Sequence, residues 1–318
     1  MHVIGIDAGG TKTVCLLADE RGVILSEARG PGANLHAAGE HAVERVLRDL
    51  IAEAIGDRAI VPAAMCLGIA GVDREDEMRT VRAIMGRIGH ASRVLIVNDA
   101  LIALTAGAKD APAIVIISGT GSIVYGRNAN GEAARAGGWG HMIGDEGSGY
   151  WIGREALSAV MRAYDGRGPA TRLSAAILLH LNVNDESRLP RIVYDREVPR
   201  MTVAAMGPMV RDAADEGDPV ARRILERAAD ELVLAAQSVA SRLEMRGDEF
   251  SFFLGGGAFR AVPWLASELE RRLVEVAPRC SVETLNEEPA AGAVWLALAE
   301  ARGGANVPRY KKGVETRD

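Results

Sequence analysis

Aromatic side chains are scarce in this chain: Phe, Trp and Tyr together make up 4% of its 318 residues. Proteins that bind single-stranded nucleic acid stack bases on aromatic side chains, so this scarcity argues against such a surface. The net charge of −6 provides no general attraction to a phosphate backbone either. We therefore expect no nucleic-acid partner.

The sequence also lacks any run of 18 apolar residues, and its first residues read as a strand rather than a signal peptide. Cysteine is rare. Cys15, Cys66 and Cys280 lie far apart, without the C-x-x-C or Cys/His spacing of a metal site. Cys15 and Cys66 fall in apolar segments that are typical of a core. These features predict no membrane association, a cytoplasmic location and reduced thiols.

Two common nucleotide motifs are missing: there is no G-x-x-x-x-G-K-[ST], and no G-x-G-x-x-G follows a strand. Three other glycine-rich loops are present, each after an apolar segment that reads as a strand. They are Asp7-Ala8-Gly9-Gly10-Thr11-Lys12-Thr13, Ser118-Gly119-Thr120-Gly121-Ser122 and Gly255-Gly256-Gly257. Glycine lets a backbone approach a phosphate closely, and the Thr and Ser hydroxyls can add donors. The loops predict a nucleotide bound between two related halves; ordinary tight turns are the alternative.

The first hundred residues show a regular order of strands and helices. Alternating apolar residues predict strands over 2–7, 13–18 and 22–28. Short apolar runs predict buried parallel strands over 63–69 and 94–98. Apolar residues at helical spacing predict a helix over 39–55, and a second helix is expected between the two strands, around 74–88. A further helix is expected directly after the last of these strands.

A second cycle begins with strands over 113–118 and 122–127, and a third strand can follow the turn after them. Helical segments dominate from 149 to 245, before a strand at 250–254, a helix, and a strand near 280–285. The order βββαβα therefore occurs twice. This pattern predicts an α/β protein with a duplicated βββαβα core, that is, two similar lobes with a cleft between them.

We place the N-terminal lobe at residues 1–109 and the C-terminal lobe at 110–288, with a last helix over 289–302. The segment 305–318 is polar and lacks periodicity. We predict that this tail is mobile.

Glycine is densest between Gly137 and Gly153, where the segment also holds two Trp, one His and two carboxylates. Such a segment cannot be a regular helix or strand throughout. We predict a loop whose backbone approaches a ligand closely, followed by a helix from about Ser148. A plain surface loop is the alternative.

Asp99 is the strongest candidate for a catalytic residue. It follows the predicted strand that ends near Val97, and ligands of open α/β sheets bind outside the carboxyl ends of the strands. A carboxylate there can accept the proton of a substrate hydroxyl that attacks a phosphoryl group. A helix N-cap is the alternative role, and Asp145 is the alternative base. Asp7, at the end of the first strand, suits a hydrated Mg²⁺.

The three glycine loops resemble the phosphate-1, phosphate-2 and adenosine motifs of the actin, Hsp70 and sugar-kinase superfamily. The segment from Gly138 to Ser148 resembles the N-acetylglucosamine kinases of the BadF/BadG/BcrA/BcrD ATPase family. The resemblance covers about residues 2 to 302. It implies a two-lobed, ribonuclease-H-like (actin-like ATPase) fold that closes over ATP and an amino sugar. It also implies that helix 289–302 returns to the N-terminal lobe. A homodimer is common among similar kinases.

The resemblance assigns roles to individual residues. Asp99 would be the base. Asp7, because of its place at the end of the first strand rather than because of the resemblance, would hold Mg²⁺, directly or through water. The resemblance places Thr11 and Thr120 at the ATP phosphates and Gly256 and Gly257 near the adenosine. The glycine loops themselves add further ATP-binding residues: Gly9, Gly10, Thr13, Gly119 and Gly121. The sugar-binding residues would be Asn34, Leu35, Gly138, Trp139, Gly140 and Asp145. Leu35 stands where the family has a His, so this sequence departs from the pattern there.

The predicted function is the phosphorylation of an amino sugar with ATP and Mg²⁺, and the favoured acceptor is the 6-hydroxyl of N-acetyl-D-glucosamine. Glucosamine and N-acetylmuramic acid are alternative substrates. A non-catalytic, ATP-binding sugar sensor is the alternative from another class. The presence of Asp99 together with complete phosphate loops favours an enzyme over a sensor. An assay of sugar-dependent ADP release separates the two hypotheses.

Overall fold

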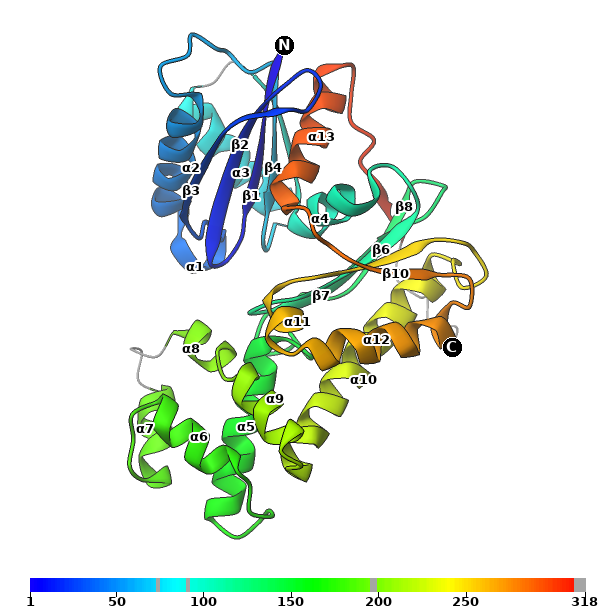
Figure 1. Ribbon diagram of the computed structural model, residues 1–318. Helices are drawn as coiled ribbons and strands as arrows, with labels where there is room; N and C mark the ends of the chain where they lie inside the picture. The colour runs from blue at the N-terminus through cyan, green and yellow to red at the C-terminus, as the bar shows by residue number, and fades with distance from the viewer. Residues whose placement is uncertain (73–74, 90–91, 195–198, 312–318) are drawn as a thin grey trace. The chain divides into compact units, whose positions relative to one another are not determined.

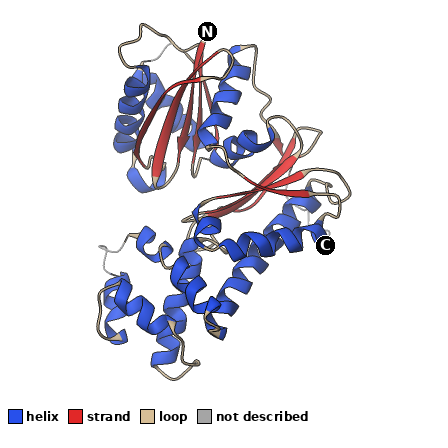
Figure 2. Ribbon diagram, viewed as in Figure 1, coloured by secondary structure: helices blue, strands red, loops and turns tan. Residues whose placement is uncertain are grey.

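The chain forms two α/β units in the computed structural model (Figures 1 and 2). Among the described residues, unit 1 contains Met1–Val115, Tyr125–Ala133 and Leu285–Lys311; unit 2 contains Ile116–Val124 and Ala134–Thr284. The structure describes residues 1–72, 75–89, 92–194 and 199–311. In these ranges, no helix is both long enough and apolar enough to cross a membrane.

The sheet of unit 1 has the strand order β3-β2-β1-β4-β5. Its strands are β1 (His2–Ala8), β2 (Lys12–Asp19), β3 (Ile24–Pro31), β4 (Ala64–Ile69) and β5 (Arg93–Asn98). β1, β2 and β3 form the predicted antiparallel meander, while β4 and β5 run parallel to β1. Every residue of β4 is buried, as expected for a strand covered on both faces.

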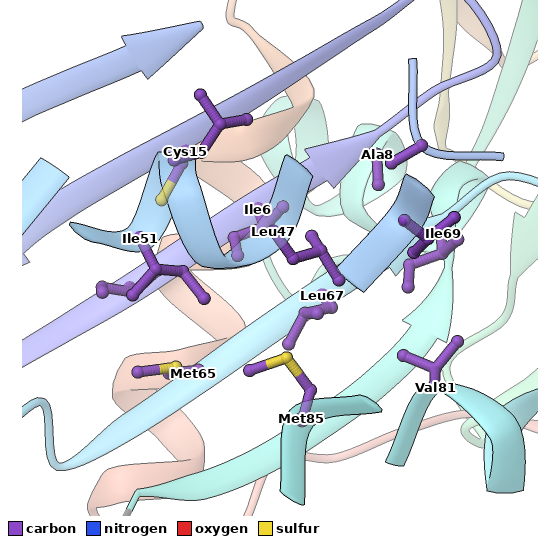
Figure 3. Packing of buried hydrophobic residues seen from close by; sticks show 14 of the residues in the cluster. Ile6, Ala8, Cys15, Leu47, Ile51, Met65, Leu67, Ile69, Val81 and Met85 are labelled. Atoms are coloured by element: carbon purple, nitrogen blue, oxygen red, sulfur yellow. The ribbon is translucent and has the colours of Figure 1, made fainter. Parts of the chain in front are cut away.

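Helices cover both faces of this sheet (Figure 2). They are α1 (Leu35–Ala38), α2 (Glu40–Ile55), α3 (Glu75–Ile88), α4 (Asp99–Ala108) and α13 (Pro289–Ala301). The buried residues of α2 recur at helical spacing, and Leu47 and Ile51 pack against Ile6, Met65 and Leu67 of the sheet (Figure 3). Cys15 and Cys66 are fully buried, which confirms their prediction as core residues.

Helix α13 packs on the other face, beside β1 and α4 (Figure 1). Glycine makes this contact close. A Cβ atom on Gly5 would lie 2.4 Å from the backbone nitrogen of Val294, and one on Gly292 would lie 1.9 Å from the carbonyl oxygen of Ile102. The last helix therefore returns to unit 1, as the sequence resemblance implied.

The second sheet has the strand order β10-β9-β6-β7-β8-β11. Its strands are β6 (Ala113–Ser118), β7 (Ser122–Arg127), β8 (Glu132–Gly137), β9 (Ser251–Gly255), β10 (Ser281–Thr284) and β11 (Arg309–Tyr310). If β6 to β10 are matched with β1 to β5, both sheets have the same order. This agreement confirms the predicted duplication.

Strand β11 was not predicted, because two residues are too short for a periodic pattern. Arg309 and Tyr310 pair in parallel with β8, so this part of the polar tail has regular structure. The prediction of mobility for residues 312–318 lies outside the described residues.

The helices that follow β8 confirm the predicted helical region. They are α5 (Gly149–Tyr164), α6 (Leu173–His180), the 3₁₀ turn η1 (Glu186–Arg188), α7 (Leu189–Tyr194), α8 (Arg200–Ala204), α9 (Gly207–Asp215) and α10 (Pro219–Arg242). α11 (Gly257–Ala261) and α12 (Pro263–Val276) follow β9. α5 begins at Gly149 because Ser148 caps it: the Ser148 hydroxyl accepts a hydrogen bond from the Trp151 N–H.

Candidate active site

Two aspartates meet at the carboxyl edge of the first sheet. Asp7 lies near the end of β1, opposite Gly68 of β4, and Asp99 follows the end of β5. A Cβ atom on Gly68 would lie 2.3 Å from the side chain of Ile102, so glycine at this position lets α4 pack closely on β4. Burial, first, and the negative charge of Asp99, second, raise the pKa of Asp7 to about 7. The two carboxylates therefore lie within electrostatic reach of each other.

The N-cap of α4 is Asn98. Its side-chain oxygen accepts a hydrogen bond of 2.8 Å from the Ala100 N–H. The capping role that the sequence allowed for Asp99 therefore belongs to its neighbour. Asp99 is the first residue of the helix, where the positive end of the helix dipole favours an ionised carboxylate.

The first glycine loop closes as a tight turn between β1 and β2. The Gly9 N–H donates to the Lys12 carbonyl at 3.0 Å, and Gly10 and Thr11 are exposed. Thr13 differs from its neighbours. It is fully buried, and its hydroxyl donates to the carbonyl of Pro31 at 2.8 Å. Thr13 thus joins β2 to β3, while Thr11 presents the hydroxyl of the exposed loop.

Lys12 forms an ion pair that the sequence does not reveal. Its ammonium donates to both carboxylate oxygens of Glu288, at 3.1 and 3.0 Å, and Arg29 donates to the same carboxylate at 3.1 Å. Glu288 directly precedes α13, 276 residues beyond Lys12. No local sequence motif predicts an ion-pair partner at that separation.

Asn34 and Leu35 lie near the same edge of unit 1. The Asn34 side chain donates to the carbonyl of Ala70 at 3.0 Å. Leu35 packs against the hydrophobic core and offers no polar group. The departure from the family pattern at position 35 therefore has a structural use, because the leucine contributes to the core of unit 1.

In unit 2, two serines tie the second glycine loop to the glycine-dense segment. The Ser118 hydroxyl donates to the Gly147 carbonyl at 2.8 Å, and the Ser122 hydroxyl donates to the Glu146 carbonyl at 2.7 Å. We predicted that the Ser122 hydroxyl donates to a phosphate. In the structure this hydroxyl donates to a backbone carbonyl of the protein instead. These bonds fix the end of the loop that runs from Gly137 to Gly147, hereafter the 137–147 loop.

Asp145 lies over the second glycine loop. Its carboxylate accepts a hydrogen bond of 3.3 Å from the Ser122 N–H, and a Cβ atom on Gly121 would lie 2.9 Å from the Asp145 Oδ2. Asp145 is 7% exposed, and its backbone has a φ of +61°. Burial raises its pKa, while the bond from Ser122 and the charge of Arg200 act in the opposite direction.

Trp139 lies at the open part of the 137–147 loop. It is 56% exposed, and the Arg135 guanidinium lies 4.3 Å from the centre of its ring. Gly138 and Gly140, on either side, have φ of +72° and +83°. The loop therefore presents a broad aromatic surface next to a buried carboxylate, Asp145.

The third glycine loop packs against the second. Gly256 has a φ of +111°, and a Cβ atom there would lie 2.2 Å from the Ser118 carbonyl oxygen. Other glycines have room around them. A Cβ atom on Gly10 would meet nothing within 4 Å, and on Gly119 and Gly257 the nearest atoms would be 4.0 and 3.9 Å away. In each loop, therefore, one glycine position has room for a side chain, and packing within the protein does not explain why it is glycine.

Unit 1 therefore brings together Asp7, Asp99, the first glycine loop and Asn34. Unit 2 brings together the other two glycine loops and Asp145, and its 137–147 loop also holds Gly138, Trp139 and Gly140. Sequence reasoning missed the pair Lys12–Glu288, the tie from Ser118, and Arg200, whose charge reaches Asp145. The contact made by Ser118 could have been predicted, because Ser118 is the first residue of the predicted second glycine loop. Arg200 lies in a helical region without a motif.

Comparisons with known proteins show which family the chain belongs to. Residues 4–297 match the family described as the BadF/BadG/BcrA/BcrD ATPase family. An N-acetylmuramic acid/N-acetylglucosamine kinase from Clostridium acetobutylicum is 36% identical over 94% of this chain and 99% of its own. An N-acetyl-D-glucosamine kinase from Dictyostelium discoideum is 33% identical over 93% of this chain and 97% of its own.

Among solved structures, a candidate N-acetylglucosamine kinase from Chromobacterium violaceum superposes with a TM-score of 0.72 at 26% identity, covering 93% of this chain and 98% of that one. These matches confirm the resemblance and the two-lobed ribonuclease-H-like fold predicted from the sequence. The cleft between the lobes stays a prediction.

Proposed function

Because the chain belongs to the BadF/BadG/BcrA/BcrD ATPase family, we propose that it transfers the γ-phosphoryl group of ATP to the 6-hydroxyl of an amino sugar, with N-acetyl-D-glucosamine as the favoured acceptor. Two curated relatives that match nearly the whole chain are kinases of N-acetylated amino sugars. The observation that supports the proposal most directly is the pair of carboxylates at the edge of the first sheet, where Asn98 caps the helix. A homodimer and a cytoplasmic location stay predictions.

In the proposed reaction, Asp99 is the general base. Its carboxylate accepts the proton of the sugar hydroxyl while that oxygen attacks the γ-phosphorus, and the bond to the oxygen of the leaving ADP breaks. The first turn of α4 offers its positive end to the ionised carboxylate before the reaction. General-base catalysis of this kind contributes about 10²–10⁴-fold in rate.

We assign ATP binding to the three glycine loops. Gly10, Gly119 and Gly257 leave open space where a side chain would be, so a phosphate or an adenosine can approach the backbone. Thr11 and Thr120 would donate from their hydroxyls. Thr13, which we also predicted to bind ATP, would act indirectly by holding β2 to β3 behind the first loop.

The residues of unit 1 suit Mg²⁺. Asp7 supplies carboxylate oxygens, which this ion prefers. Among the described residues, no group of three or more His, Cys, Asp or Glu side chains could hold a metal. Mg²⁺ typically takes one or two carboxylates together with substrate phosphates, so Asp7 would hold it with ATP, directly or through water. When bound, the ion neutralises negative charge on the phosphates.

We assign sugar binding to the 137–147 loop and to Asn34. Asp145 would accept hydrogen bonds from sugar hydroxyls, and Trp139 would cover the ring or its N-substituent with its exposed face. Gly138 and Gly140 would let the backbone approach the sugar. Leu35 would contribute only apolar contact.

A coupled assay of ADP release with a panel of amino sugars tests the proposal. We expect release that depends on N-acetyl-D-glucosamine, and Asp99→Asn should lower kcat by about 10²–10⁴-fold with the sugar KM within a small factor. Asp145→Asn, which tolerates the positive φ, is the matched control and should instead raise the sugar KM. Near-normal turnover in folded Asp99→Asn would refute the assignment of the base. ATP binding without any sugar-dependent ADP release would favour the sensor.

A further inference from the structure

Helix α8 is held against α5 by close backbone contact. A Cβ atom on Gly153 of α5 would lie 2.0 Å from the Val203 carbonyl oxygen, and one on Gly149 would lie 3.3 Å from that of Ala204. Val203 is buried in the same contact. The start of α8 therefore has a fixed position in unit 2, and its first residue, Arg200, is exposed there.

Arg200 reaches the 137–147 loop. Its Nη1 lies 3.2 Å from the Nδ1 of His141, a residue between Trp139 and Asp145 in the sequence. The His141 ring also meets the Tyr150 ring edge-on, with centroids 5.2 Å apart. Nδ1 can accept from the guanidinium only when the imidazole is neutral, and burial and the charge of Arg200 both lower the pKa of His141. The histidine therefore orients the arginine beside the loop.

Among the described residues, no carboxylate forms an ion pair with the Arg200 guanidinium, although its charge acts on the buried Asp145. A guanidinium has five N–H donors in a planar fork that matches a carboxylate, and one contact to His141 leaves most of them available. A neutral amino sugar has no need of such a cation.

We propose that Arg200 is a specificity-determining residue that binds the carboxylate of an acidic amino sugar. The lactyl ether of N-acetylmuramic acid is such a group. The inference rests on the proposed function, because it places the sugar against the 137–147 loop. It adds the residue that would bind an anionic amino sugar, the class of acceptor that the name of the Clostridium acetobutylicum relative includes beside the neutral one.

Parallel kinetics on two acceptors test this inference. Wild type should phosphorylate both N-acetyl-D-glucosamine and N-acetylmuramic acid. Arg200→Gln should lower kcat/KM for N-acetylmuramic acid by about 10–100-fold, the range expected for a lost charge-assisted pair, and should change the value for N-acetyl-D-glucosamine less than about threefold. Arg200→Lys, which keeps the charge but not the fork, should fall between the two. Arg154→Gln, at an exposed arginine paired with Glu155, is the control and should affect neither sugar.

Three outcomes would overturn the inference. Wild type that phosphorylates N-acetyl-D-glucosamine but not N-acetylmuramic acid refutes it while leaving the proposed function intact. An equal loss for both sugars with a raised ATP KM would assign Arg200 to a phosphate instead. No selective loss in Arg200→Gln would show that the carboxylate is bound elsewhere. Thermal unfolding of each variant, with and without N-acetylmuramic acid, separates these results from a folding defect: the acidic sugar should stabilise wild type and Arg154→Gln most, Arg200→Lys less and Arg200→Gln least.

Discussion

Asp7 keeps a proton that an aspartate in water would have lost. Burial is the first cause of its pKa of about 7, and the neighbouring Asp99 carboxylate is the second. Lys12 acts in the opposite direction, but its ammonium is shared with Glu288, whose own charge raises the pKa of Asp7 again. An ionised Asp7 therefore lowers the stability of the folded state whenever no cation is bound beside it.

The raised pKa of Asp7 makes the stability of the folded state depend on pH. Between about pH 4 and pH 7 the folded state keeps the proton on Asp7 while the unfolded state releases it, so this contribution to stability is complete below about pH 4 and is lost as the pH rises through 7. We expect Asp7→Asn to be more stable than wild type at pH 8 by roughly 2–4 kcal/mol, and close to wild type at pH 4. Urea unfolding at both pH values, without Mg²⁺, measures the difference. A gain that is equal at both pH values would argue against this origin.

Neighbouring glycines in the third loop should respond differently to a side chain. Gly257→Val meets open space, so we expect unchanged thermal stability and at least about a tenfold rise in the ATP KM, equivalent to roughly 1.4 kcal/mol. Gly256→Ala places its Cβ against the Ser118 carbonyl at a positive φ and should lower stability by about 1–3 kcal/mol. Position 257 is therefore the better test of the adenosine site. Unchanged ATP affinity in Gly257→Val would make the loop a structural turn.

At the scale of elements, α13 depends on packing more than on charge. Glu288 joins it to Lys12 and Arg29, but all three side chains are at least 38% exposed, and such ion pairs contribute about 0–1 kcal/mol. The contact of Gly292 with the backbone of α4 leaves no room for even one methyl group.

We therefore expect Gly292→Ala to lower the free energy of unfolding by roughly 1–3 kcal/mol or more, and Glu288→Gln to lower it by less than about 1 kcal/mol. Chemical denaturation of both variants at pH 7 provides the comparison. If Glu288→Gln proved the more damaging substitution, the ion pair would be the main attachment of the helix.

The elements themselves could be predicted because each has a local signal. Alternation gave the meander of β1 to β3, and helical spacing gave α2. Two-residue β11 has no such signal. The roles of single residues were harder to predict, because they depend on long-range contacts: the ion pair of Lys12 spans 276 residues, and the burial of Thr13 follows from the pairing of β2 with β3.

At the scale of the whole molecule, the repeated strand order was predictable because both halves present the same succession of patterns. Each half ends its first strand in a glycine loop, so the duplication places equivalent loops at equivalent positions of two sheets. The halves differ in what the helices contribute. The region from α5 to α10 holds the fixed α8 with Arg200, and unit 1 has no equivalent of it among its described helices.

The interleaving of the units has a consequence for biosynthesis. Unit 1 begins with the first strand to leave the ribosome, yet it needs α13, and it cannot be completed until residue 301 has been translated. Most of unit 2, Ile116–Val124 and Ala134–Thr284, is encoded before α13, so these residues are available earlier. The apolar faces of β1 and α4 that α13 covers therefore stay exposed until α13 has been translated. A nascent chain of this protein presents a surface for chaperones that the finished molecule no longer has.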